Sequence, residues 1–236
     1  MRGKLIVIEG TDCSGKETQS KKLVERLEKE GIPVKVISFP FYNTPTGDII
    51  GGPYLGKKHI SDTWFSEGPT NVDPKVGSLF YAADRYYNLP KIKSLLSKGV
   101  NVIIDRYSSS NMAHQGGKIQ NKNERLAFYE WVDDLEYKLL GLPKPDMTFL
   151  LYMPYQYSLM LRERRAEAGD GHEMSKEHLI NAEAAYLELA ELYDYIVVND
   201  TVENAADKIM AIIRAEHAKT ERTIATYQNL IGLDKE

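Results

Sequence analysis

The residues from 10 to 16 have the types and spacing of a phosphate-binding loop. They read GTDCSGK, the pattern G-x-x-x-x-G-K, and they lie between the apolar run 5–8 and a helical pattern. The glycines allow successive backbone N–H groups to curl around an anion, and the start of the helix adds a partial positive charge. We expect Lys16 to reach the terminal phosphates of a nucleotide, and the whole phosphate site to comprise Gly10, Thr11, Asp12, Cys13, Ser14, Gly15, Lys16, Glu17 and Thr18.

The residue after Lys16 departs from this motif. Ser or Thr usually stands there because its hydroxyl binds Mg²⁺, whereas this chain has Glu17 followed by Thr18. A carboxylate is a ligand that Mg²⁺ accepts, although it adds negative charge beside the phosphates. Three arrangements stay open: Glu17 binds the metal, Thr18 or water replaces the missing hydroxyl, or Glu17 points away.

A second group of chemical residues lies further along the chain. Asp105 ends the apolar run 100–104, a position from which a carboxylate holds Mg²⁺ or its waters opposite a phosphate loop, and Arg106 follows it. Tyr81 and Arg85 are four residues apart in a helical pattern, so their side chains share one helix face. An aromatic ring and a guanidinium group that project together can stack a base and bind its phosphate.

Five short apolar runs, each predicting a strand, alternate with helical patterns. The runs lie at 5–8, 34–39, 100–104, 147–151 and 195–198, and the pattern before the last one includes Leu179, Ala182 and Tyr186. Asp73 and Pro74 are typical of a helix start, and Lys98 and Gly99 of a helix end. The alternation predicts a three-layer α/β fold of the phosphate-loop NTPase type, in which helices flank a five-stranded parallel sheet. We expect a single domain over residues 1–236.

Three segments depart from this alternation. Residues 43–73 are rich in Gly, Pro, Asn and Thr and predict a long irregular excursion, which in compact domains often serves function. Residues 165–175 are polar and contain glycine between two helical patterns, and we expect a mobile lid there. A final helix is predicted from about 203 to 218, and a polar tail follows to 236.

Composition excludes several classes of protein. The chain has 236 residues, 42% of them hydrophobic, which is enough for a sizeable core and excludes a disordered or collagen-like chain. No apolar run approaches the roughly 18 residues of a membrane span, and no secretory signal is visible. The net charge of -4 argues against nucleic acid as a partner. A single cysteine, Cys13, excludes an internal disulfide and is consistent with a cytoplasmic location.

Several motifs together resemble the thymidylate kinases, a family of nucleoside monophosphate kinases. Besides the phosphate loop, which runs on to Gln19, the motifs are Phe39-Pro40, the helix LFYAADR at 79–85, the box DRY at 105–107 continuing to 115, and Pro145-Asp146. They occur in family order over roughly residues 4–200, and several motifs are more specific than any one. The resemblance implies phosphorylation of dTMP to dTDP with ATP and Mg²⁺ in dTTP biosynthesis, and a homodimer.

The resemblance also implies roles for individual residues. Asp12 matches the carboxylate that meets the nucleotide sugar and the metal, which makes Asp12, Asp105 and Glu17 the candidate metal ligands. Arg85 and Arg106 match arginines that hold the acceptor phosphate and the transferred phosphate. The dTMP site then comprises Phe39, Tyr42, Tyr81, Arg85, Arg106, Ser110, Asn111, His114 and Gln115. His114 stands where Tyr or Phe often lies beside the deoxyribose, and Tyr42 near where many relatives have an arginine.

The implied reaction is direct in-line phosphoryl transfer without a covalent intermediate. The phosphate loop has no arginine between Asp12 and Lys16, so positive charge is expected from the lid side. Arg162 and Arg165 share a helix face there, whereas Arg164 points roughly 200 degrees away. Transfer of this kind depends on positioning and charge neutralisation, so the catalytic residues are expected to be Lys16, Asp12, Arg106, Asp105, Arg162 and Arg165.

Two alternatives stay open from sequence. His114 and Tyr42 allow a kinase for another monophosphate, such as dUMP, or a broader deoxynucleotide kinase. Glu17 in the magnesium position allows a catalytically weak nucleotide-binding regulatory module. A regulatory module would not need the acceptor residues Tyr81, Arg85 and Arg106, which favours the kinase.

Overall fold

A computed structural model describes residues 2–12, 14–157, 160, 176–199 and 201–231, with side chains described as far as 216. Its centre is a five-stranded, fully parallel sheet in the order β2-β3-β1-β4-β5, and all five predicted strands are confirmed. The strands are β1 (Leu5–Glu9), β2 (Val34–Ser38), β3 (Asn101–Asp105), β4 (Met147–Tyr152) and β5 (Tyr195–Val198).

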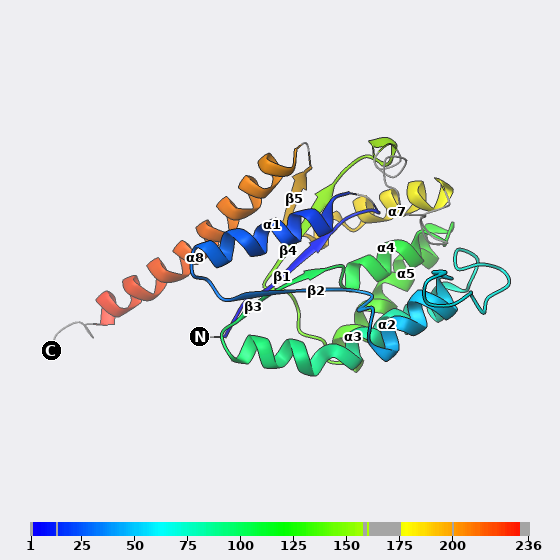
Figure 1. Ribbon diagram of the computed structural model, residues 1–236. Coiled ribbons are helices and arrows are strands. Elements are labelled where there is room, and N and C mark those ends of the chain that lie inside the picture. The colour runs from blue at the N-terminus through cyan, green and yellow to red at the C-terminus, as the bar shows by residue number, and fades with distance from the viewer. Residues whose placement is uncertain (1, 13, 158–159, 161–175, 200, 232–236) are drawn as a thin grey trace.

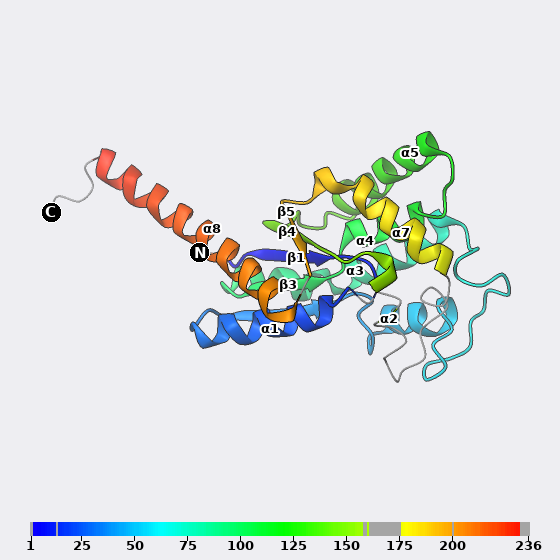
Figure 2. The same ribbon diagram turned by 90° about the horizontal axis from the view of Figure 1, so that it is seen from above.

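Helices cover both faces of the sheet, which confirms the predicted three-layer α/β architecture (Figure 1). The helices α1 and α8 lie on one face, and α3, α4, α5 and α7 lie on the other, as the view from above also shows (Figure 2). Their bounds are α1 (Lys16–Lys29), α2 (Pro45–Ile49), α3 (Pro74–Ser97), α4 (Ser108–Gly116), α5 (Lys122–Asp133), α7 (Lys176–Glu188) and α8 (Val202–Ile231), with shorter η1 (Ile50–Tyr54), η2 (Asp134–Leu139) and η3 (Ala190–Leu192).

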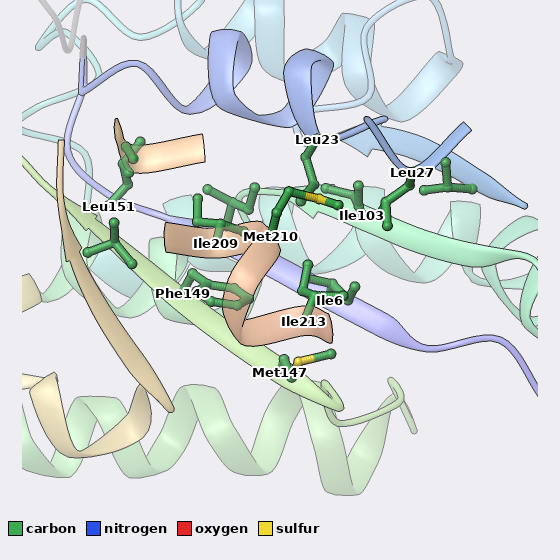
Figure 3. Packing of buried hydrophobic residues seen from close by; sticks show 14 residues of the cluster. Ile6, Leu23, Leu27, Ile103, Met147, Phe149, Leu151, Ile209, Met210 and Ile213 are labelled. Atoms are coloured by element: carbon green, nitrogen blue, oxygen red, sulfur yellow. The ribbon is translucent and has the colours of Figure 1, made fainter. Parts of the chain in front are cut away.

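The central strands β1 and β3 are apolar in their middle because both faces are buried, and each ends in a carboxylate, Glu9 or Asp105. On one face, Ile6 and Ile8 of β1 belong to one core cluster with Leu23 of α1 and Ile209 of α8. Figure 3 shows Ile6, Leu23 and Ile209 of this cluster. On the other face, the alternate residues Leu5 and Val7 pack with α3. Burial on both faces anchors β1, and with it the loop that follows, against the helices on each side.

The ends of α3 confirm the predicted helix signals. Asp73 accepts hydrogen bonds from the backbone N–H groups of Lys75 and Val76, and Pro74 is the first helical residue. The helix ends at Ser97, and Gly99 adopts the left-handed backbone conformation that glycine tolerates.

Two segments have more regular structure than their sequences predict. Residues 43–73 contain α2 and the π-helical turn η1, and Tyr54 of that turn is completely buried among Ile50, Phe65 and Phe80. The last helix, α8, continues to Ile231 where a polar tail is expected from about 218. Its far end extends away from the sheet (Figures 1 and 2). None of the described helices combines the length and the apolar character that a bilayer crossing requires.

Candidate active site

The phosphate loop lies between β1 and α1, as the sequence predicts. Gly10 and Gly15 have φ angles of 150° and 89°, which favour glycine. A Cβ atom at Gly10 would stand 2.6 Å from the Leu151 carbonyl oxygen of β4, so no larger residue fits there. The loop is closed by a hydrogen bond from the Ser14 N–H to the Thr11 carbonyl at 3.3 Å.

Side-chain hydrogen bonds connect this loop to Asn199, the residue that follows the end of β5. Asn199 donates its side-chain N–H to the Ser14 carbonyl oxygen at 2.7 Å. Gln19 of α1 in turn donates to the Asn199 side-chain oxygen at 3.2 Å. The loop, α1 and the segment after β5 are thereby joined, although the sequence motif gives no sign of Asn199.

Lys16 is the cation of the loop. Its ammonium group donates to the Thr11 carbonyl oxygen at 2.5 Å and is almost completely buried. Burial and the nearby Arg106 lower the pKa of Lys16 to about 8, against the opposing effect of Asp105, Asp12 and Glu9. Since that pKa lies above neutrality, Lys16 stays mostly protonated at pH 7 and supplies positive charge where a phosphate chain would lie.

Asp12 and Arg106 form an ion pair that connects the phosphate loop to the end of β3. Burial alone would raise the pKa of Asp12, but the positive charges of Arg106 and Lys16 hold it well below its usual range. Arg106 itself has a φ angle of 68°, a left-handed conformation that is unusual outside glycine and that often marks functional positions. The structure thus brings four predicted residues, Asp12, Lys16, Arg106 and His114, into one electrostatic group.

Among the predicted metal ligands, Asp105 has the environment that suits Mg²⁺. It is buried at the end of β3, and its Oδ1 atom has no hydrogen-bond partner among the described residues. Burial raises its pKa, although Lys16 and Arg106 act in the opposite direction. An orphaned carboxylate oxygen beside a phosphate loop fits a metal that takes one or two carboxylates together with phosphates.

Glu17 and Thr18 lie differently. The Glu17 side chain is 69% exposed and accepts a hydrogen bond from Lys21 at 2.6 Å, and Thr18 is exposed as well. The Glu17 carboxylate thus lies in solvent beside Lys21, although its charge also acts to raise the pKa of Asp105. The described residues contain no cluster of three or more His, Cys, Asp or Glu side chains that could enclose a metal ion.

Arg85 occupies a buried ion pair that the sequence does not predict. Its Nε and Nη2 atoms donate to the Glu136 carboxylate of η2 at 2.6 and 2.5 Å, and the two side chains are 2% and 0% exposed. Asn111 of α4 donates to the same carboxylate at 2.8 Å. Arg85 pairs with Glu136 whereas Arg106 pairs with Asp12, so the two arginines predicted to bind phosphates stand in separate ion pairs.

Unpaired polar atoms lie on the face of α4 that contacts α3. The Oδ1 atom of Asn111 and the Nε2 atom of Gln115 are buried, and neither has a hydrogen-bond partner among the described residues. Tyr54 donates to the Gln115 oxygen at 3.4 Å, and its ring meets that of Tyr81 edge-on at 5.9 Å. Helix α4 thus carries one buried acceptor and one buried donor without a partner among the described residues, which is unusual for buried polar atoms.

Three other predicted substrate residues make contacts within the protein. The Phe39 side chain is buried in the core cluster with Ile92 and Tyr107. Tyr42 lies beneath the Lys57 ammonium group, 4.7 Å from the ring centre. Ser110 bonds to the Glu9 carboxylate and, at 2.8 Å, to Tyr186. Cys13 and the predicted lid, with Arg162 and Arg165, lie outside the described residues.

Glu9 is a structural residue of the site that sequence analysis missed. It is fully buried at the end of β1 and accepts hydrogen bonds from the Tyr107 and Ser110 N–H groups and from the Ser109 hydroxyl. These bonds satisfy the first N–H groups of α4 and fix the backbone beside Arg106. The sequence does carry a signal for Glu9: it is a carboxylate at the end of an otherwise apolar strand, directly before Gly10 of the loop.

Comparisons with known proteins show what the chain is similar to. The family model described as thymidylate kinase matches residues 8–211. The human thymidylate kinase is 35% identical over 172 residues, which cover 73% of this chain and 68% of that protein. A probable thymidylate kinase of Pyrococcus abyssi is 33% identical over 92% of this chain and 98% of its own length. A solved structure of the Candida albicans thymidylate kinase, whose title reports broad substrate specificity, matches with a TM-score of 0.69 and 26% identity, covering 92% of this chain and 93% of that one.

Proposed function

The chain belongs to the thymidylate kinase family, and from this premise we propose how its residues bind and phosphorylate dTMP. The enzyme is a thymidylate kinase, and ATP is the family's phosphate donor. The electrostatic group that contains Lys16, Asp12 and Arg106 carries the proposal for the site, because it places the buried Lys16 and the partly buried Arg106 at the carboxyl edge of the sheet, where the phosphates of two nucleotides would meet.

We assign the ATP phosphates to the loop of residues 10–18. Backbone N–H groups of the loop and the start of α1 bind the phosphate oxygens, and Lys16 exchanges its bond with the Thr11 carbonyl for one with the terminal phosphates. Asp105 and Asp12 would hold Mg²⁺, which when bound neutralises charge on the phosphates. The orphaned oxygen of Asp105 supports this assignment more strongly than any feature of Glu17.

We assign the base of dTMP to the side of α4 that faces α3, where Asn111 and Gln115 lie. Thymine has a donor, N3–H, and carbonyl acceptors on its edge, which complement the free oxygen of Asn111 and the free nitrogen of Gln115. Tyr81 stacks on the base, and Arg85 acts by holding Glu136 and so the orientation of Asn111. Arg106, paired with Asp12 beside the phosphate loop, is then the guanidinium available to the transferred phosphate.

In this arrangement the side chains position the two nucleotides and stabilise the transferred phosphate, but none of them forms a covalent bond with it. The acceptor phosphate oxygen is already anionic, so no side chain needs to remove a proton to create the nucleophile. Lys16 and Arg106 neutralise charge that spreads over the transferred group, in line with a mechanism dominated by electrostatics.

A panel of monophosphates tests the substrate assignment. With ATP and Mg²⁺, we expect ADP release to depend on the acceptor and kcat/KM to be highest for dTMP, lower for dUMP and lowest for UMP and CMP. The experiment is a coupled ADP-release assay, repeated with excess EDTA, in which turnover should be lost. Equal turnover of UMP and dTMP would contradict the base and sugar assignments, and tight ATP binding without acceptor-dependent ADP would support a regulatory module.

We also propose a homodimer formed through α3. Val76, Leu79 and Tyr86 lie on one face of this helix and are 40%, 50% and 52% exposed, an arrangement that leaves a large apolar stripe in water. Light scattering coupled to size-exclusion chromatography should give twice the chain mass of 26.8 kDa. Leu79→Glu should shift the protein to a monomer, whereas Leu187→Glu, at an exposed leucine of α7, should leave the dimer intact. A monomeric wild type would contradict this proposal.

A cytoplasmic location stays a prediction from sequence.

A further inference from the structure

His114 stands between Arg106 and a second histidine. Its Nε2 atom is 2.9 Å from Nη1 of Arg106, and its Nδ1 atom is 3.3 Å from Nε2 of His178. The two imidazole rings are stacked with their centres 5.5 Å apart, and the Tyr186 ring meets His114 edge-on at 5.7 Å. His178 belongs to the first turn of α7, is 5% exposed, and has no role in any motif of the sequence.

The direction of these hydrogen bonds follows from the chemistry of arginine. A guanidinium group only donates, so Nε2 of His114 must accept, and the proton of the neutral ring must lie on Nδ1. Nδ1 of His114 then donates to Nε2 of His178, which in turn must accept. The contacts form a chain with one direction, from Arg106 through His114 to His178.

The surroundings keep His178 in the form that can accept. Burial lowers its pKa to about 4, and the positive charges of Lys118 and Arg106 act in the same direction, whereas Asp12 acts against them. At neutral pH the ring is therefore uncharged and retains a lone pair. A protonated His178 would place an N–H group against the N–H group of His114 and would break the chain.

We propose that His178 is a positioning residue for phosphoryl transfer, which fixes the tautomer and orientation of His114 and through it the guanidinium of Arg106. The proposal rests on the function proposed above for Arg106, because the chain ends on the guanidinium that also pairs with Asp12. A loosened Arg106 would neutralise the transferred phosphate less well, while the phosphate loop would bind ATP as before. The effect of His178 should therefore appear in kcat and not in the KM for ATP.

Two substitutions at His178 separate positioning from packing. His178→Phe fills the space of the ring but removes the acceptor, and His178→Gln places a carbonyl oxygen near the position of Nε2. We expect His178→Phe to lower kcat for dTMP by about five- to tenfold, the size associated with one lost hydrogen bond, with the KM for ATP within about twofold. His178→Gln should recover most of the loss, and His59→Gln, at an exposed loop histidine, should match the wild type.

The wild type is assayed first, and a wild type that does not phosphorylate dTMP would contradict the proposed function itself rather than the role of His178. If the wild type does phosphorylate dTMP, equal kcat values for the Phe and Gln variants, or a wild-type kcat for His178→Phe, would overturn the positioning role. If His178→Phe fails to fold, nitrogen NMR of isotope-labelled wild type tests the proposal instead, because it reports which ring nitrogen of His114 carries the proton. His114 is expected to carry its proton on Nδ1, and a signal for a proton on Nε2 of neutral His114 would overturn the proposal.

Discussion

Lys16→Ala is expected to lower kcat for dTMP phosphorylation by about 10²–10³-fold, the effect of removing one preorganised charge donor from a transition state. Lys16 is buried in the phosphate loop, and its pKa of about 8 keeps it mostly charged at neutral pH. Alanine leaves the backbone N–H groups of the loop in place, so ATP should still bind. The KM for ATP should therefore rise by a smaller factor than the factor by which kcat falls. The measurement is steady-state ADP release with saturating dTMP over a range of ATP concentrations.

A matched control lies on the same helix. Lys29→Ala removes an exposed lysine from the last turn of α1 and should leave kcat within about twofold of the wild type, as expected for a surface change. Circular dichroism should show both variants folded. A near-normal kcat for Lys16→Ala would show that the Lys16 ammonium group does not contribute to phosphoryl transfer.

Glu136→Ala is expected to lower the free energy of unfolding by about 3–5 kcal/mol, because it leaves the Arg85 charge buried without its partner. Both side chains are almost completely excluded from water, and the carboxylate receives two hydrogen bonds from Arg85 and one from Asn111. The measurement is urea unfolding followed by fluorescence, with the midpoint and slope compared between wild type and variant.

The chain offers a matched ion pair near the surface. Arg125 of α5 also binds a carboxylate through two nitrogens, that of Glu188, but these side chains are 20% and 21% exposed. Glu188→Ala should therefore cost only about 1 kcal/mol or less. Equal losses from Glu136→Ala and Glu188→Ala would show that burial does not set the cost, and that Arg85 reaches water in the folded protein.

Much of the fold could be predicted because its signals are local. The strands alternate with helical patterns, Asp73 and Gly99 bound α3, and the spacing GTDCSGK stands directly between a strand and a helix. Each of these depends on backbone conformations or hydrogen bonds within a few residues, which local sequence specifies. The parallel sheet and its helical layers follow from the order of these elements.

The partners of buried charges could not be predicted because they come from distant segments. Arg85 meets Glu136, which lies in a π-helical turn 51 residues further along the chain. His178 reaches His114 from 64 residues away, and Ser110 is bound by Glu9 across 101 residues. A sequence shows that an arginine or serine is polar, but which carboxylate it meets depends on how the helices pack.

Amphipathic pattern was also an incomplete guide to burial. The sequence of α3 carries apolar residues on several faces, so Val76 and Leu79 remain exposed while Leu89 and Ile92 enter the core. A single chain does not reveal whether such residues face its own core or a second subunit. Helix α8 likewise continues to Ile231, beyond the end predicted at about 218.

The most direct measurement follows the phosphate itself. ATP labelled in its γ-phosphate is incubated with the enzyme, Mg²⁺ and dTMP, and the nucleotides are separated. We expect the label to appear in dTDP as ADP forms, to depend on dTMP, and to be transferred about 10²–10³-fold more slowly with Lys16→Ala. Label that stays in ATP although ATP binds, or that is released as free phosphate at the same rate with and without dTMP, would contradict a site in which Lys16 and Arg106 bring two nucleotides together.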